Sequence, residues 1–100
     1  MGMGSQETRV ALTAIIVREG TDVAALNALL HQYGRYIIGR MGVPYQKRGV
    51  NIISVALDAP ADAISALTGR LGRLPDVTVK TVYAPPEAVD PGVPRPPADE

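Results

Sequence analysis

The chain has 100 residues, 46% of them hydrophobic, and it carries ten basic and ten acidic side chains. This length predicts one domain near the lower limit for an adequate core, so assembly into an oligomer would help to stabilise it. The balanced charge provides no global field for nucleic acid or an anionic membrane. The absence of cysteine excludes disulfides, thiolate metal sites and cysteine catalysis, and it fits a reducing compartment. Because no apolar run is long enough for a membrane span, we expect a soluble, cytoplasmic protein.

The first element expected is a strand over residues 9–18. It is rich in β-branched residues and apolar on both alternating sets, which is typical of a strand in the middle of a sheet. Residues 19–22 supply a turn, and Asp22 is suited to cap a helix over residues 23–33 that Gly34 ends. The face of this helix expected to be buried comprises Val23, Leu26, Leu29, Leu30 and Tyr33.

A β-hairpin is expected over residues 36–55. The apolar run 37–43 and the β-branched run 50–55 have strand composition, and Pro44 and Gly49 favour a turn between them. Two strands are therefore predicted in the middle of the chain.

A second helix is expected after the hairpin, with Asp58 as its cap and Pro60 in its first turn. Its buried stripe comprises Ile64, Leu67, Leu71 and Leu74, and Pro75 closes it. Gly69 and Gly72 weaken a helix, which predicts a close packing contact or an early end. A last strand is expected over residues 77–83.

The two ends of the chain differ from the middle. Residues 1–8 are interpreted as a disordered N-terminus or an expression remnant, because both Met1 and Met3 are candidate starts. Residues 84–100 hold six of the nine prolines and four carboxylates, which predicts a disordered, acidic, Pro-rich tail. The folded domain is expected over residues 9–83.

The two halves of the chain repeat at a constant offset of 41 residues, which relates Val23 to Ile64 and Leu30 to Leu71. The same offset relates the first strand to the third and the second to the fourth. Two βαβ units with right-handed crossovers interleave into an α+β ferredoxin-like βαββαβ sandwich, with two helices on one face of a four-stranded antiparallel sheet. Strands one and three are expected in the centre and strands two and four at the edges.

The residues present argue against several functions that proteins with this fold perform. An RNA reader needs stacking aromatics on the central strands, which carry none. An acylphosphatase-like enzyme needs an arginine-bearing phosphate cradle, and Arg18 with Gly20 lacks its glycine-rich pattern, which favours a strand-end charge. His31 falls on the polar face of its helix and is interpreted as solvated. We therefore expect no enzyme, no metal site and no cofactor.

One cationic cluster is a candidate ligand site. Arg40, Lys47 and Arg48 could hold an anion with help from backbone N–H groups at Gly39 and Gly42. The alternative is a solvated hairpin whose charges protect an edge strand.

Four large side chains near the second strand are candidate oligomer contacts, because aromatic residues beside an exposed edge often mark an interface. They are Tyr33, Tyr36, Met41 and Tyr45.

Several segments together resemble the family of iron-only hydrogenase system regulators. They are LHQYG at 30–34, YIIGRMGVPY at 36–45, the strand 49–58 with its following Ala-Pro, and LTGRLG at 67–72. The resemblance covers about residues 10–83. The family is ACT-like, which implies a ferredoxin-like subunit that forms dimers or tetramers through sheet edges and helices. It also implies a regulatory module that binds a small molecule at a subunit interface.

A more distant similarity links the chain to the C-terminal domain of a nickel-responsive repressor. At the positions of that domain's ligands this sequence has Gly34, Gly42, Pro44 and Val50, whose side chains cannot bind nickel. The chain also lacks the repressor's ribbon–helix–helix reader, which argues against metal sensing and against direct DNA binding by this chain alone. A second hypothesis is therefore a protein-interaction module that docks through its sheet edge and acidic tail.

Overall fold

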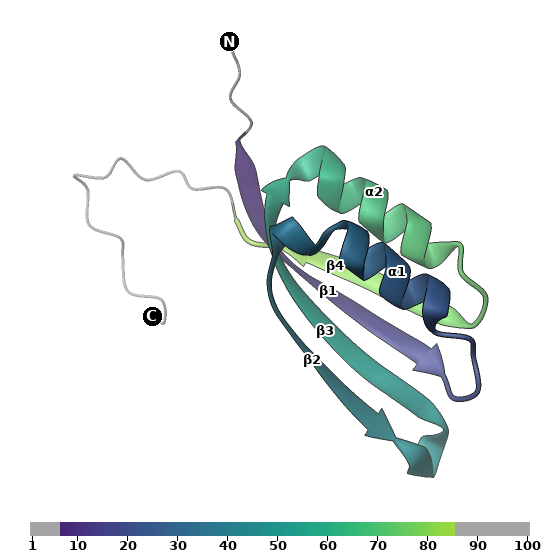
Figure 1. Ribbon diagram of the computed structural model, residues 1–100. Helices are drawn as coiled ribbons and strands as arrows, with labels where there is room; N and C mark the ends of the chain where they lie inside the picture. Colours follow the sequence, from purple (N-terminus) through teal and green to yellow (C-terminus); the bar gives the residue numbers. More distant parts are fainter. Residues whose placement is uncertain (1–6, 86–100) are drawn as a thin grey trace, which may run out of the picture.

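Four strands and two helices alternate as βαββαβ in the computed structural model, which describes residues 7–85. The elements are β1 (Thr8–Arg18), α1 (Ala24–Gln32), β2 (Ile37–Tyr45), β3 (Val50–Pro60), α2 (Ala61–Gly72) and β4 (Val77–Tyr83). The strands pair antiparallel in the order β2-β3-β1-β4 (Figure 1). This confirms the ferredoxin-like prediction, including the central strands. Residues 1–6 and 86–100, which hold most of the two segments expected to be disordered, lie outside the described residues.

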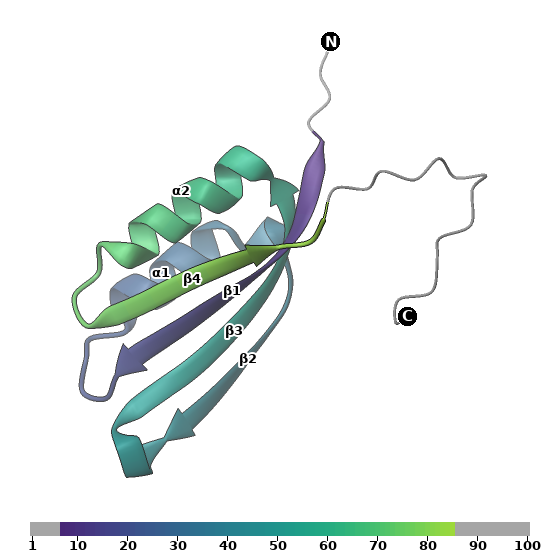
Figure 2. The ribbon, with the colours of Figure 1, turned by 180° about the vertical axis from the view of Figure 1, so that it is seen from behind.

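Both helices lie on one face of the sheet, and no part of residues 7–85 covers the other face (Figures 1 and 2). The alternation along β1 follows from this arrangement, because successive side chains of a strand point to opposite faces. Ala11, Ile15 and Val17 are buried, whereas Leu12 and Ile16 are exposed. The apolar composition of β1 on both sides thus predicted its central position correctly, but the domain buries only one of its faces.

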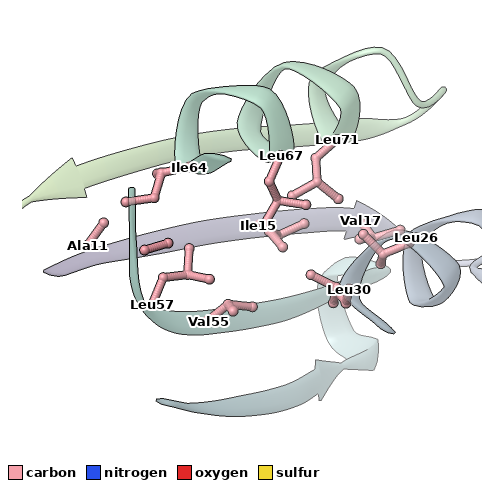
Figure 3. Close-up of a cluster of buried hydrophobic side chains, with 11 residues drawn as sticks. Ala11, Ile15, Val17, Leu26, Leu30, Val55, Leu57, Ile64, Leu67 and Leu71 are labelled. Carbon is pink, nitrogen blue, oxygen red and sulfur yellow. The ribbon is translucent and has the colours of Figure 1, made fainter. Parts of the chain in front are cut away.

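The core lies between the helices and the sheet (Figure 3). The helices contribute Leu26, Leu30, Ile64, Leu67 and Leu71, and the central strands contribute Ala11, Ile15, Val17, Val55, Leu57 and Ala59. The predicted stripe of α2 is confirmed, although Leu74 is only half-buried. On α1 the prediction for Val23 is wrong, because the helix begins one residue later and Val23, its N-cap, stays exposed.

Three boundary residues take roles that differ from the predicted ones. Asp22 accepts a hydrogen bond from the Ala24 backbone N–H at 2.9 Å, but it lies one residue before the N-cap position. Asp58 does not cap α2, because β3 continues through Pro60, and Pro60 itself is the N-cap. Pro44 is not in the turn but within β2, where an edge strand tolerates a residue without an N–H.

The turn between β2 and β3 depends on a glycine. Gly49 adopts φ 67°, a left-handed conformation in which a side chain would be strained. Its carbonyl oxygen accepts a hydrogen bond from the Glu19 backbone N–H at 2.7 Å, which joins this turn to the end of β1.

The two glycines of α2 differ in their surroundings. At Gly72, the last residue of the helix, an added Cβ would lie 3.5 Å from Cγ1 of Val79, so α2 packs closely on β4 there. At Gly69 an added Cβ would meet nothing within 4 Å. The expected packing contact and helix end therefore belong to Gly72 alone.

Three threonine hydroxyls connect α2 to the sheet. Thr81 on β4 shares hydrogen bonds with Thr13 on β1, at 3.0 Å, and with Thr68 on α2, at 2.7 Å. Thr13 is fully buried, and this series satisfies its hydroxyl within the core. Neither helix of the described residues is long and apolar enough to cross a membrane.

Candidate functional site: a groove between α1 and β2

A groove of about 300 Å³ separates the start of α1 from the edge strand β2. It exists because β2 presents Arg40, Gly42 and Pro44 to the helical side of the sheet, opposite Val55, Ile53 and Asn51 of β3. Gly42 has no side chain to fill the space, and an added Cβ would lie 4.0 Å from Cγ1 of Ile53. The groove is lined by Val23, Leu26, Asn27, Arg40, Gly42, Val43, Pro44, Asn51 and Ile53.

The lining combines an apolar wall with three polar side chains. Arg40 supplies a positive charge, Asn27 and Asn51 supply amides, and no acidic residue is present. A guanidinium with amides beside an apolar wall suits a small molecule with a carboxylate and an apolar part. The volume lies at the small end of the range for ligand sites, about 300–1,000 Å³.

Arg40 has its charge available for a ligand. Within residues 7–85 no carboxylate lies within ion-pair distance of its guanidinium, and the ion pair found there joins Arg18 and Asp76 at 3.9 Å. Arg40 is also exposed, which lets its head group turn into the groove. The charge is therefore not neutralised by the described part of the fold.

The predicted anion site is only partly assembled. Arg40 and Gly42 line the groove together, whereas Gly39, Lys47 and Arg48 do not. Lys47 and Arg48 belong to a 3₁₀ turn, Gln46–Arg48, at the tip of the hairpin. Gly39 lies three residues before Gly42, on the other face of β2, opposite Ala56 and next to a bulge at Ile38. Of the three predicted cations, only Arg40 therefore lines the groove.

The four predicted interface residues separate into two places. Tyr33 and Tyr36 lie at the end of α1 with ring centroids 6.5 Å apart, and both are half-buried. Arg70 and Arg35 lie over these two rings at 6.0 and 4.9 Å. Met41 and Tyr45 instead lie on the uncovered face of the sheet, where they are exposed.

The residues weighed for other chemistry lie apart from the groove. Arg18 ends β1 beside Asp76, and both side chains are more than half exposed. His31 is exposed on α1. In the part of the chain that the structure describes, no three His, Asp or Glu side chains gather into a metal-binding group.

Most of the groove lining was missed by sequence reasoning. Val23, Leu26, Asn27, Asn51 and Ile53 come from α1 and β3, and only the tertiary fold brings them beside β2. A usable signal was the alternation along β2, because Arg40, Gly42 and Pro44 must share one face of a strand. That face lacks a large side chain in its middle, which predicts a gap.

The fold and groove define a ferredoxin-like domain with an open, cationic groove beside its edge strand. The chain belongs to the family described as "TM1266-like: Iron-only hydrogenase system regulator, putative", whose model matches residues 9–81. It is similar to the solved structure of uncharacterized protein TM1266 from Thermotoga maritima, with 35% sequence identity and a TM-score of 0.74. That match covers 77% of this chain and 98% of the other. No curated protein matches the chain. The family resemblance is thereby confirmed.

Proposed function

We propose that this chain is a non-enzymatic regulatory module, active as an oligomer, that binds a small amphipathic anion in the groove between α1 and β2. The family description supplies the regulatory role, in an iron-only hydrogenase system. The groove supplies the means of sensing. The observation that supports the proposal most is the position of Arg40, a cation without a described carboxylate partner at the rim of a mainly apolar groove.

The lining also favours binding over catalysis. It contains no carboxylate, imidazole, hydroxyl or thiol, so it has no side chain for proton transfer or nucleophilic attack. Arg40 and the two amides orient a carboxylate, and Val23, Leu26 and Ile53 contact the apolar part of the ligand. Specificity then depends on the size of that apolar part.

A thermal-shift titration tests this proposal. The probes are small monocarboxylic acids that differ in the size and branching of their apolar part. A ligand at about 100 times its Kd stabilises the folded state by about 2.7 kcal/mol, which is easily seen as a rise in Tm. The expected result is a saturable shift for acids of one size class.

Two variants of the same hairpin make the titration decisive. Arg40→Gln removes the charge in the groove, whereas Lys47→Gln removes one from the exposed hairpin tip. A charge-assisted hydrogen bond contributes about 1.5–3 kcal/mol, so R40Q should weaken binding tenfold or more and K47Q should leave it unchanged. Equal loss in both variants, or no saturable shift with any acid, would contradict a specific site at Arg40.

The second candidate is an interaction module without a small-molecule ligand. The uncovered apolar face of the sheet favours it, because monomeric soluble proteins rarely expose large apolar patches. Under this alternative R40Q leaves every property of the protein unchanged except its surface charge.

A further inference from the structure

The face of the sheet that the helices leave uncovered (Figure 2) carries exposed apolar side chains from all four strands. Its exposed large side chains are Val10, Leu12 and Ile16 of β1, Met41, Val43 and Tyr45 of β2, Ile52 of β3 and Val82 of β4. Their exposed fractions range from 41% for Ile52 to 66% for Val82. An antiparallel sheet that faces water normally carries polar residues on that side, so this face is built for contact with another surface.

Charge is confined to the margins of this face. Arg18 lies in the last pair of the β1–β3 ladder and Asp58 near the other end, opposite Val10. Lys80 lies on the edge strand β4, opposite Ala14. A charge-depleted centre inside a charged rim is the composition of a protein–protein interface.

The area of the face is sufficient for a dimer. Four strands about 4.8 Å apart, averaging nine to ten residues of about 3.4 Å, span about 600 Å² before the relief of the side chains is counted. Two such faces would bury about 1,200 Å² together, which reaches the range of specific interfaces.

The surface shape of the face is complementary to that of a second copy. The register places Ala14 beside Ser54 across the two central strands, and the next pair on the same face is Ile16 beside Ile52. A row of two small residues thus adjoins a row of two large ones. Consider a second copy that faces the first and is related to it by a two-fold axis between the two sheets, perpendicular to the strands. The row of large residues in each copy then contacts the row of small residues in the other.

We infer that two copies of this chain pack face to face through the uncovered side of the sheet, with Ile16 and Ile52 of each copy against Ala14 and Ser54 of the other. This inference goes beyond the proposed ligand binding and does not depend on it. It places self-association on the face of the sheet rather than at its edge. The groove stays free in such a dimer, because Arg40 and Gly42 point to the helical side.

The test is sedimentation velocity of the full-length chain over a range of concentrations. Ala14→Glu places a carboxylate in the centre of the proposed interface, and Ala66→Glu places one on the exposed outer side of α2. Each A14E dimer would take two carboxylates out of water, each with only Lys80 of its own β4 beside it, so its dissociation constant should rise about tenfold or more. The wild type and A66E should remain dimers with equal dissociation constants.

A second variant distinguishes loss of dimerisation from loss of folding. Ile16→Thr keeps a β-branched side chain suited to the strand but removes apolar contact area from both copies. It should stay folded by circular dichroism and dissociate about tenfold or more readily than the wild type. A monomeric wild type up to millimolar concentration, or a folded A14E that is as dimeric as A66E, would overturn the inference. Neither result would bear on carboxylate binding, which R40Q tests separately.

Discussion

The two faces of this sheet are made by the same strands but have opposite surroundings. In β1, Ile15 is fully buried beneath the helices, whereas Ile16, the next residue, is 44% exposed on the other side. Both alternating sets of β1 are apolar, so hydrophobicity along this strand does not reveal which face the chain covers itself. Apolar residues beyond the needs of one domain's core are therefore available for a second contact.

The largest expected effect contrasts two leucines of the central strands. Leu57 is 1% exposed on the covered face and Leu12 is 47% exposed on the open face. Leu57→Ala should lower the free energy of unfolding by about 2–5 kcal/mol, because it leaves a cavity in the core. Leu12→Ala should cost about 1 kcal/mol or less when urea unfolding is measured on dilute, dissociated protein. Equal losses of unfolding free energy in L57A and L12A at such dilution would contradict the assignment of a covered and an uncovered face.

The next effect contrasts two glycines that lie on opposite faces of β2. Gly42→Ala places a methyl group in the groove, whereas Gly39→Ala places it on the other face of the strand, and both positions have room for a Cβ. One methyl group in a ligand site changes binding by about tenfold to a hundredfold. Calorimetry with an acid found by the titration should show this loss for G42A only.

A smaller effect is expected within the covered face, at the threonine series. Thr81→Val removes the hydroxyl that both Thr13 and Thr68 use. Because Thr13 is fully buried, its hydroxyl loses a partner that water cannot easily replace, and the free energy of unfolding should fall by about 1–3 kcal/mol. Thr68→Val, in which only the outer hydroxyl of the series is lost, should cost less. Urea unfolding of both variants checks the order.

The smallest effect is a stabilisation on the outer side of α2. Gly69 is exposed in the helix, and an added Cβ meets nothing within 4 Å. Gly69→Ala should raise the free energy of unfolding by about 0.5–1 kcal/mol through helix propensity alone. Thermal unfolding should show a higher Tm with an unchanged oligomeric state, and a lower Tm would mean that this helix face is covered by something else.

The fold was predictable because local pattern and internal repeat agreed. The stripe through Leu67 and Leu71 and the bounds of β4 hold in the structure, and the 41-residue offset relates these two leucines to the buried Leu26 and Leu30 of α1. The offset fails between β1 and β3, because it relates the buried Ile15 to Ala56, which lies on the uncovered face opposite Leu12. Errors arose where a neighbouring element overrides a local signal. Pairing with β1 extends β3 through Pro60, so Asp58 remains in the strand and does not become the cap of α2.

The candidate site was less predictable because its lining comes from three elements. The cluster of Arg40, Lys47 and Arg48 was close in sequence, but sequence proximity in a hairpin does not imply a shared surface. Only Arg40 lies at the groove, because the other two belong to the turn at the hairpin tip. The uncovered face was likewise invisible, since the alternating pattern of β1 was apolar in both phases.

Ligand sensing through Arg40 can be tested by native mass spectrometry of the wild type and of R40Q, each purified gently from the native host. We expect the wild type to be an even-numbered oligomer that carries one additional small mass per subunit, and R40Q to be the same oligomer without that mass. A wild-type oligomer without any bound mass, or an equal mass in R40Q, would contradict ligand sensing through Arg40. A bare monomer would contradict both the ligand site and the use of the open face for self-association.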